Sequence, residues 1–277
     1  ILNLIMPAMT GYSLRAIQGF TKENVDDLRL PIMLAQLITA VGVFLIPSFL
    51  FAYWSHPSVK KYLRLYTPKP LHVLLAVCML LGALPLFLEI GVFFKKLIPG
   101  IADGADQVEL LIKISKPTEL VVLTLVMAIS PGVCEELFFR GVLLRFAHQR
   151  TNKLMLSAII TSILFAAAHN SIYNAPSITI AGILLCYIYY WSGSMITGMI
   201  AHTVYNAVQI YFSYLATTNP NLKAMSASEH LPWYIVVAGT VIFIFSAYTL
   251  WKTRNTLSSN WSANFTPEEM QEQNENL

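Results

Sequence analysis

Long apolar stretches dominate the chain, and short polar segments separate them. A helix needs about 20 predominantly apolar residues to cross the roughly 30 Å of hydrocarbon in a bilayer. By this criterion the sequence predicts membrane helices at 31–54, 71–94, 119–148, 153–170, 176–191, 194–216 and 232–251. Residues 1–9 are apolar but too short to span, so we expect them to be the end of a truncated first helix. The predicted fold is therefore an all-α, polytopic transmembrane bundle of about eight helices.

The composition agrees with a bilayer as the solvent. Hydrophobic residues make up 56% of the chain and charged residues 12%, whereas soluble domains carry roughly 25% charged residues. The mean hydropathy is +0.58. The net charge is +3, and most Lys and Arg residues lie between apolar stretches, where they set topology. We expect membrane lipid as a partner and no nucleic acid.

The polar segments suggest an orientation and a domain boundary. Nine Lys or Arg residues fall on the side of 55–70, 145–153 and 252–254, and eight on the other, which favours a cytoplasmic C-terminus. Residues 1–254 are expected to form the bundle. Residues 255–277 are rich in Asn, Gln, Ser and Glu, and we expect them to be a disordered tail.

The predicted helix at 119–148 carries three charged residues in its apolar sequence, namely Glu135, Glu136 and Arg140. Each charge costs about 2.5 to 3.5 kcal/mol at the centre of a membrane helix, so three of them require a reason. Glu136 and Arg140 are four residues apart and share a face, which predicts an ion pair. Glu135 points about 100° away. A buried carboxylate without a neighbouring cation is a candidate acid or base.

Two further predicted helices carry polar or aromatic residues at the same four-residue spacing. Phe165 and His169 lie on one face of the fifth helix, and His202 and Asn206 on one face of the seventh. A Glu, two His and an Asn supply a base, its partner and two hydrogen-bond donors, which is the residue set of a hydrolytic site.

The depth of these residues can be compared through the rise of about 1.5 Å per residue in a helix. Counted from the side where the fourth and fifth helices meet, Glu135 lies roughly 20 Å deep and His169 roughly 24 Å. From the same side His202 lies roughly 12 Å deep and Asn206 roughly 18 Å. We therefore expect the four residues within a few helical turns of one another, in a pocket that admits water.

The same residues also fit functions other than hydrolysis. Buried ionisable groups also mark proton or ion pathways, so the cluster fits an ion-coupled transporter or a non-enzymatic immunity or scaffold protein. Glu135, His169 and His202 are all of types that bind zinc. We favour a metal-free site, because no two candidate ligands on one helix have the spacing of a His-Glu-x-x-His motif.

Other classes of intramembrane protease leave different signatures. No His in the chain is followed by Glu, so the His-Glu-x-x-His motif of zinc peptidases is absent. The Asp residues all fall in predicted loops, which excludes a paired intramembrane aspartyl site. Ser194 lacks the Gly-x-Ser-Gly setting of rhomboid-like serine proteases. Cys78, Cys134 and Cys186 share no metal-binding spacing.

Three motifs together resemble a known family. Glu135-Glu136-x-x-x-Arg140, Phe165-x-x-x-His169 and His202-x-x-x-Asn206 are similar to the signatures of the CPBP (CAAX protease and bacteriocin-processing, or Abi) family, in family order on separate predicted helices. The resemblance covers about residues 119–216. It implies an intramembrane glutamic peptidase. Eukaryotic members remove the last three residues of prenylated CAAX proteins.

The resemblance also implies roles and a setting. By position, Glu135 and His169 match the pair thought to activate water, and His202 and Asn206 match the proposed oxyanion-stabilising pair. Glu136, Arg140 and Phe165 are expected to support the site or position substrate. Many prokaryotic members have unknown substrates or are linked to bacteriocin immunity. We expect a prokaryotic cell-membrane protein that needs no cofactor and acts on a lipidated or membrane-bound protein or peptide.

Overall fold

The computed structural model describes residues 10–13, 19–100, 108, 110–112, 117–255, 257 and 261–263. These residues form helices and connecting segments without a strand, which confirms the predicted all-α fold. The main elements are α3 (Val25–Thr39), η1 (Ala40–Leu45), α4 (Ile46–Ser55), α5 (Val59–Tyr62), α6 (Pro70–Leu97), α8 (Pro117–Leu123), η2 (Thr124–Ile129), α9 (Ser130–Glu136), η3 (Leu137–Leu143), α10 (Leu144–Thr151), α11 (Leu154–Ala167), α12 (Ala175–Ser192), α13 (Met195–Thr218), α14 (Pro220–Ala227) and α15 (Trp233–Lys252).

Two of the helical rods contain π-helical segments. The first rod runs from Val25 to Ser55 with η1 inside it, and the second runs from Pro117 to Thr151 with η2 and η3 inside it. A π segment often marks a functional position in a helix. In the second rod, η3 begins immediately after the two adjacent glutamates and contains Arg140. The rod that carries the charged motif is therefore irregular at the motif itself.

Five helices in the described part of the chain are long and apolar enough to cross a membrane. They are 25–55, 70–97, 117–151, 175–192 and 233–252. The apolar helix α11 has 14 residues and is shorter than a full span. Helix α13 has 24 residues, but its polar residues lower its hydropathy. The two elements that miss the criterion thus both carry part of a predicted motif.

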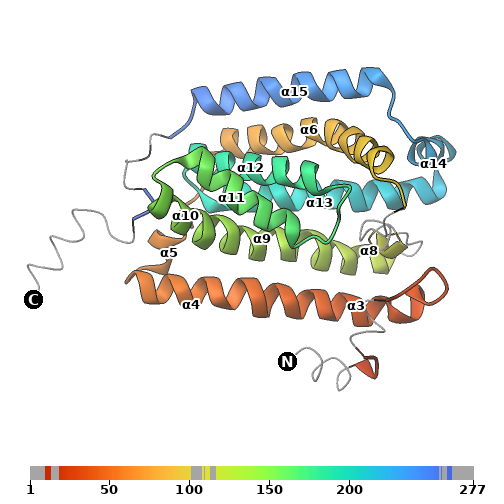
Figure 1. Ribbon diagram of the computed structural model, residues 1–277, viewed down its shortest axis with the longest axis horizontal. Helices are drawn as coiled ribbons and strands as arrows, with labels where there is room; N and C mark the ends of the chain where they lie inside the picture. The colour runs from red at the N-terminus through yellow and green to blue at the C-terminus, as the bar shows by residue number, and fades with distance from the viewer. Residues whose placement is uncertain are drawn as a thin grey trace, which may run out of the picture.

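The helices form layers, with the motif-bearing helices in the middle. Helix α15 packs on α6 at one side of the molecule, and the rod of α3, η1 and α4 lies at the opposite side (Figure 1). Between them α13 contacts α6, α9 and η2, while α11 contacts α12. The charged and polar motifs thus lie on helices between the two outer layers.

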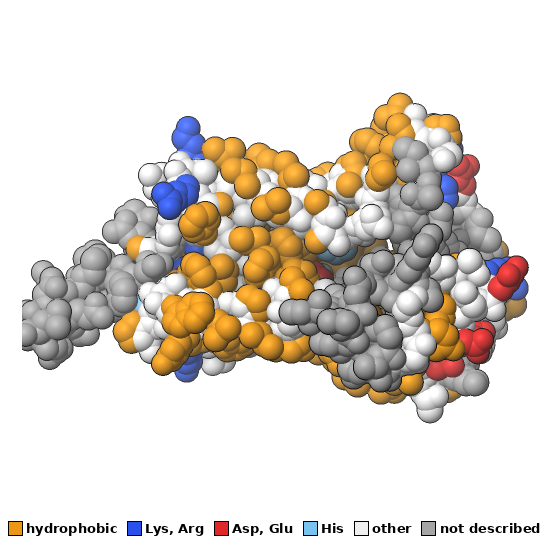
Figure 2. All heavy atoms as spheres, turned by 60° about the horizontal axis from the view of Figure 1, so that its bottom comes forward, with side chains coloured by type: hydrophobic (Ala, Val, Ile, Leu, Met, Phe, Trp, Pro, Cys, Tyr) orange, Lys and Arg blue, Asp and Glu red, His pale blue; other side chains and the backbone are white. Residues whose placement is uncertain are grey.

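The surface is divided into an apolar middle and charged ends. Hydrophobic side chains cover the middle of the face in Figure 2, and Lys, Arg, Asp and Glu side chains gather at its two ends. Large exposed apolar residues occur on the outer helices, for example Trp54 on α4 and Trp233 and Phe245 on α15. This distribution is the one expected of helices that meet lipid along their length and water at their ends.

The predicted boundaries agree with the observed helices to within three residues, except that the helix predicted at 31–54 begins at Val25. The difference at the end of α11 concerns the site. The helix predicted at 153–170 ends at Ala167, so His169 lies in the turn after α11 and is exposed. It was expected inside the helix. Asn170, which follows it, has a positive φ of 49°. A left-handed residue of this kind ends a helix and redirects the chain.

The ends of the chain are described only in part. The expected truncated first helix at residues 1–9 lies outside the described residues. Within the predicted tail, Trp261 is seated against the bundle with 5% of its surface exposed. Most of the other tail residues lie outside the described part, so the disordered tail stays a prediction there.

Candidate active site

Glu136 and Arg140 form a buried ion pair at the centre of the site. The Nη1 atom of Arg140 donates a hydrogen bond of 2.7 Å to Oε1 of Glu136, and the two side chains are 1% and 0% exposed. The Nη2 atom of Arg140 donates to the carbonyl of Gly182 on α12. This confirms the pairing predicted from the four-residue spacing. Because the pair is buried, removal of either side chain would leave the other charge without a counter-ion.

His202 joins this pair from α13. Its Nδ1 atom donates to Oε1 of Glu136 over 2.9 Å, and the ring is buried. The sequence did not predict this contact, because the two residues are 66 positions apart on different helices. Since Nδ1 is used by the carboxylate, the Nε2 atom of His202 is the ring nitrogen left to face a substrate. Glu136 therefore orients His202 as well as Arg140.

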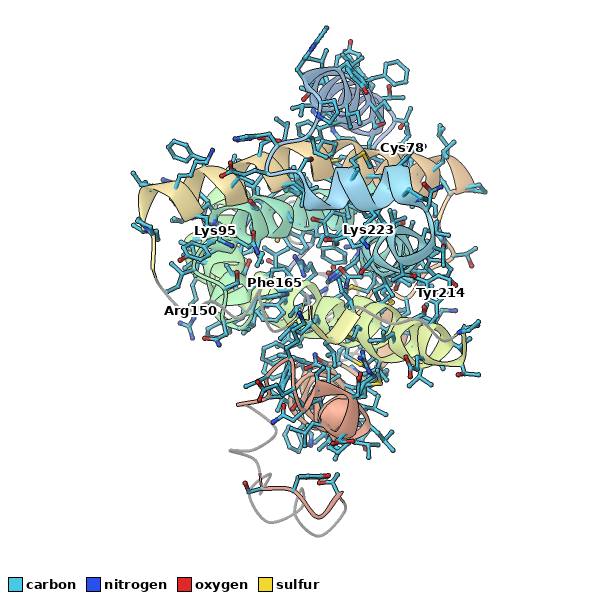
Figure 3. The ribbon with its side chains drawn as sticks, turned by 90° about the vertical axis from the view of Figure 1, so that its right-hand side faces the viewer. Cys78, Lys95, Arg150, Phe165, Tyr214 and Lys223 are labelled. Atoms are coloured by element: carbon cyan, nitrogen blue, oxygen red, sulfur yellow. The ribbon has the colours of Figure 1, made fainter. Side chains whose placement is uncertain are left out.

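Phe165 contacts residues of all three motifs. Its ring centroid lies 4.5 Å from that of His169 and 5.9 Å from that of His202. The guanidinium carbon of Arg140 lies 4.6 Å from the same centroid, a cation–π distance. Phe165 is buried in the interior of the bundle (Figure 3). The sequence predicted only a supporting role for Phe165. In the structure its ring contacts both imidazole rings and the guanidinium group.

Glu135 lies beside this cluster and keeps one carboxylate oxygen unpaired. The residue is 8% exposed, and its Oε2 atom is buried without a hydrogen-bond partner among the described residues. A buried carboxylate oxygen without a partner carries a desolvation cost that a polar ligand or water relieves. Among the described residues, Glu135 forms no hydrogen bond or ion pair with either histidine of the site. A water molecule bound by Glu135 would satisfy this oxygen.

His169 contacts Phe165 from the exposed turn after α11, and Asn206 lies on α13. The Nδ1 atom of His169 donates to the carbonyl of Phe165 over 2.8 Å, which leaves Nε2 free to accept a proton. Asn206 is partly buried on α13, one helical turn beyond His202. His202 and Asn206 therefore share one helix as predicted, whereas His169 lies in the turn after the helix that carries Phe165.

An apolar cavity of about 180 Å³ reaches His169. Its lining comes from α3, the segment around residue 110, η2 and the turn after α11: Phe20, Ile32, Met33, Gln36, Val108, Leu111, Met127, His169 and Asn170. In Figure 2 the face that includes α3 is hollowed near its middle, with histidine and acidic side-chain atoms visible at the bottom. The candidate catalytic histidine is thus accessible from a pocket with mostly apolar walls.

Two glycines allow the helix of the glutamates to approach the helix of His202. A Cβ atom on Gly132 would lie 2.2 Å from Oγ1 and 2.9 Å from the backbone nitrogen of Thr203. A Cβ atom on Gly198 would lie 3.2 Å from Oε2 of Glu136. Small residues are the usual means of close helix approach in membranes. The short distance between Glu136 and His202 therefore depends on these two positions.

We expect Gly132→Ala to separate α9 from α13 and to lower both stability and activity. Overpacking of this kind costs about 1 to 3 kcal/mol, and the backbone of Thr203 cannot move away as a flexible side chain could. Gly42→Ala is the control, because a Cβ atom there has no neighbour within 4 Å. Thermal unfolding in detergent should show a lower midpoint for Gly132→Ala only. Equal midpoints for the two variants would show that the close approach is unimportant.

The side chains do not form an evident metal site. In the residues that the structure describes, no group of three His, Cys, Asp or Glu side chains is arranged to hold a metal ion. The zinc site considered from Glu135, His169 and His202 is therefore not formed as a ligand set there. The metal-free mechanism stays a prediction.

Comparison with known proteins identifies the central part of the chain. Residues 117–208, about a third of the chain, match the model of the family described as "Type II CAAX prenyl endopeptidase Rce1-like". No curated protein and no solved structure matched the chain. The matched segment includes all three motifs and the helices that hold them, in an integral, multi-pass membrane protein. Residues 117–208 are therefore similar in sequence to the Rce1-like family of type II CAAX prenyl endopeptidases.

Proposed function

We propose that the protein is an intramembrane glutamic endopeptidase that cleaves a lipidated or membrane-bound protein or peptide. The observation that carries this proposal is the unpaired Oε2 atom of Glu135, buried next to an assembled Glu136–His202–Arg140 cluster. A structural ion pair explains the presence of Glu136 and Arg140, but it does not explain the buried carboxylate of Glu135. A role of Glu135 as a catalytic base explains it.

In the proposed mechanism Glu135 and His169 activate a water molecule. The carboxylate of Glu135 and Nε2 of His169 accept hydrogen bonds from the water, and one of them takes its proton as the oxygen attacks the scissile carbonyl. The carbon–nitrogen bond then breaks, and the proton passes to the leaving amine. The water oxygen ends in the new carboxylate, and neither an electron transfer nor a cofactor is required.

His202 and Asn206 are proposed to stabilise the oxyanion that forms on the carbonyl oxygen. Glu136 accepts from Nδ1 of His202, so Nε2 lies on the opposite side of the ring, where the imidazolium form would donate an N–H to the oxyanion. The amide of Asn206 lies one turn away on the same helix. Loss of one oxyanion donor costs about 2.7 to 4 kcal/mol in a known peptidase, so two donors on one helix face would supply a large part of the catalysis.

The apolar cavity beside His169 is proposed to hold an apolar group of the substrate close to the scissile bond. An isoprenoid or aliphatic chain suits its walls, because apolar lining with a few polar groups is typical of sites for such ligands. The resemblance to the CAAX proteases supports a prenylated substrate. The cavity is bordered by α3, an outer helix exposed to the surface.

We expect Ile32→Trp to fill this cavity and to weaken substrate binding. Ile32 lines the cavity, whereas Leu30, two residues earlier on α3, is 63% exposed and does not line it. Leu30→Trp is therefore the matched control. The measured KM should rise about tenfold for Ile32→Trp, which corresponds to about 1.4 kcal/mol, and stay unchanged for Leu30→Trp. A rise of the same size in both variants would speak against a substrate pocket at this position.

The proposed function is tested with purified protein in detergent or liposomes and a farnesylated CAAX peptide. Mass spectrometry should detect loss of the C-terminal tripeptide, and the same peptide without its lipid should be cleaved more slowly. Activity should persist after treatment with a strong metal chelator. Cleavage by wild type that chelation abolishes and zinc restores would reject the metal-free mechanism. Absence of cleavage of any lipidated peptide would reject the proposed function.

We further propose a prokaryotic cell membrane as the location, with the C-terminus in the cytoplasm. The small excess of Lys and Arg on the side of the C-terminus supports this orientation. A reporter enzyme that is active only in the cytoplasm, fused after the last residue, should be active. A reporter that is active only outside the membrane should be inactive at the same position.

A further inference from the structure

The end of the catalytic rod farthest from His169 holds a segment of the chain's own C-terminal region. In Figure 1, α5 and α10 lie at the end of the bundle from which the C-terminal segment continues. Trp261 is buried there, and its ring centroid lies 4.8 Å from that of His148 and 5.6 Å from that of Tyr190. The ring centroid of Tyr189 lies 6.0 Å away. Contacts with aromatic rings stabilise a buried indole beyond the contribution of its buried area, so this set of contacts recognises a large aromatic side chain.

The residues that follow Trp261 are held through their backbone. The Nη2 atom of Arg145 donates to the carbonyl of Ala263 over 2.6 Å, and Nε2 of Gln149 donates to the carbonyl of Ser262 over 2.5 Å. Nδ1 of His148 is hydrogen-bonded to Oγ of Ser262 over 2.8 Å. Contacts to two successive carbonyls bind a peptide whatever its side chains are, so these donors recognise main chain.

Arg145 ties the docked segment to the rest of the bundle. Its Nη1 atom donates to the carbonyl of Tyr62 over 2.8 Å, and its guanidinium carbon lies 4.2 Å from the centroid of the Tyr62 ring. The side chain is buried, and carboxylates are absent from the partners that the structure gives it among the described residues. A buried guanidinium without a counter-ion depends on such carbonyl and ring contacts. Removing the carbonyl of Ala263 would leave part of that charge unsolvated.

The clamp residues belong to the same rod as the catalytic glutamates. Arg145, His148 and Gln149 lie on α10, which continues η3 and α9 within the rod Pro117–Thr151. Arg145 lies ten positions after Glu135, and the seven residues of η3 lie between them. Helical hydrogen bonds continue through η3, so a shift or rotation of the rod at α10 is transmitted to α9.

We propose that Arg145, His148, Gln149 and Tyr190 form a peptide-binding clamp for a tryptophan followed by two main-chain carbonyls, and that its occupant is the segment Trp261–Ala263. The docked segment fixes the rod that carries Glu135 and Glu136 in its active position. This effect on the rod rests on the proposed peptidase function, whereas peptide binding by the clamp does not.

The clamp is tested by competition on the full-length protein. A fluorescent peptide with the sequence of residues 257–267 is titrated against wild type and against Trp261→Ala, with anisotropy as the readout. Trp261→Ala weakens the hold of the internal segment, so it should bind the peptide at least about tenfold more tightly than wild type, whose tethered segment competes at high effective concentration. Trp233→Ala is the control, because that residue is 76% exposed on α15; it should bind as weakly as wild type.

Further variants separate the clamp from misfolding and from the peptidase proposal. Adding Gln149→Ala to Trp261→Ala should weaken peptide binding about tenfold, whereas adding Arg150→Ala, one residue further on and outside the clamp, should not change it. Equal binding by wild type and Trp261→Ala, or no binding by either, would overturn the clamp. Cleavage by Trp261→Ala should fall and should recover when the peptide is added. Peptide binding without a recovery of cleavage would overturn the proposed effect on the rod. It would leave the clamp in place, because peptide binding needs no catalysis.

Discussion

Glu135→Gln is expected to abolish cleavage while leaving the fold intact. The amide has nearly the shape of the carboxylate but cannot accept a proton from water, and loss of general-base catalysis costs about 10²- to 10⁴-fold in rate. Glu135 carries no ion pair to a described residue, so its replacement does not strand a buried cation. Initial rates of cleavage of the farnesylated peptide are compared with wild type.

Glu119→Gln on the same rod is the control for a charge change that leaves the site untouched. Glu119 lies in the first turn of α8, distant from the motif residues along the helix. Its variant should cleave at the wild-type rate, and both variants should unfold at wild-type temperature in detergent. If Glu135→Gln retained wild-type activity, Glu135 would not be the base.

Glu136→Gln is expected to lower stability as well as activity. Arg140 would then keep a buried positive charge without its counter-ion, and breaking a buried pair in this way costs about 3 to 5 kcal/mol. His202 would lose the carboxylate that its Nδ1 atom contacts at the same time. The free energy of unfolding, measured by denaturant titration in mixed micelles, should fall by that amount, and cleavage should fall in parallel.

A double variant separates the two roles of Glu136. Replacing the pair by apolar residues, Glu136→Leu with Arg140→Met, removes both charges together and should recover most of the lost stability. Cleavage should not recover, because His202 still lacks its partner. A double variant that regained activity would show that Glu136 serves the fold alone.

The helical architecture was predictable because bilayer thickness limits the length of an apolar helix. The helix predicted at 71–94 is observed as α6 (Pro70–Leu97), and the helix predicted at 176–191 as α12 (Ala175–Ser192). The short helices α5 and α14 were not predicted, since they lie in polar connections without an apolar period. The π segments were also missed, because hydropathy does not distinguish one helical hydrogen-bond pattern from another.

Within the site, contacts along one helix were predictable and contacts between helices were not. The four-residue spacing of Glu136 and Arg140 predicted their ion pair, which the structure confirms. The bond between Glu136 and His202 depends on the approach at Gly132 and Gly198, which a single sequence does not reveal. The catalytic roles of Glu135, His169, His202 and Asn206 stay predictions.

His169 shows the limit of depth counting along an expected helix. The count assumed a helix through residue 170, and the observed helix ends at Ala167. The apolar run ends at Ala168, one residue past the helix, and the prediction extended the helix through two further polar residues, His169 and the left-handed Asn170. The burial of Trp261 was missed because the average composition of a polar segment conceals one aromatic residue that packs on the bundle.

The proposal that Glu135 acts as a base on water is tested most directly by a single turnover in H₂¹⁸O. With enzyme in excess over the farnesylated peptide, water attack predicts one ¹⁸O atom in the new carboxylate of the product in the first turnover. Direct attack by the Glu135 carboxylate would form an anhydride, which could release product carrying an enzyme-derived ¹⁶O atom in that turnover. Product without ¹⁸O after one turnover would contradict the proposed mechanism.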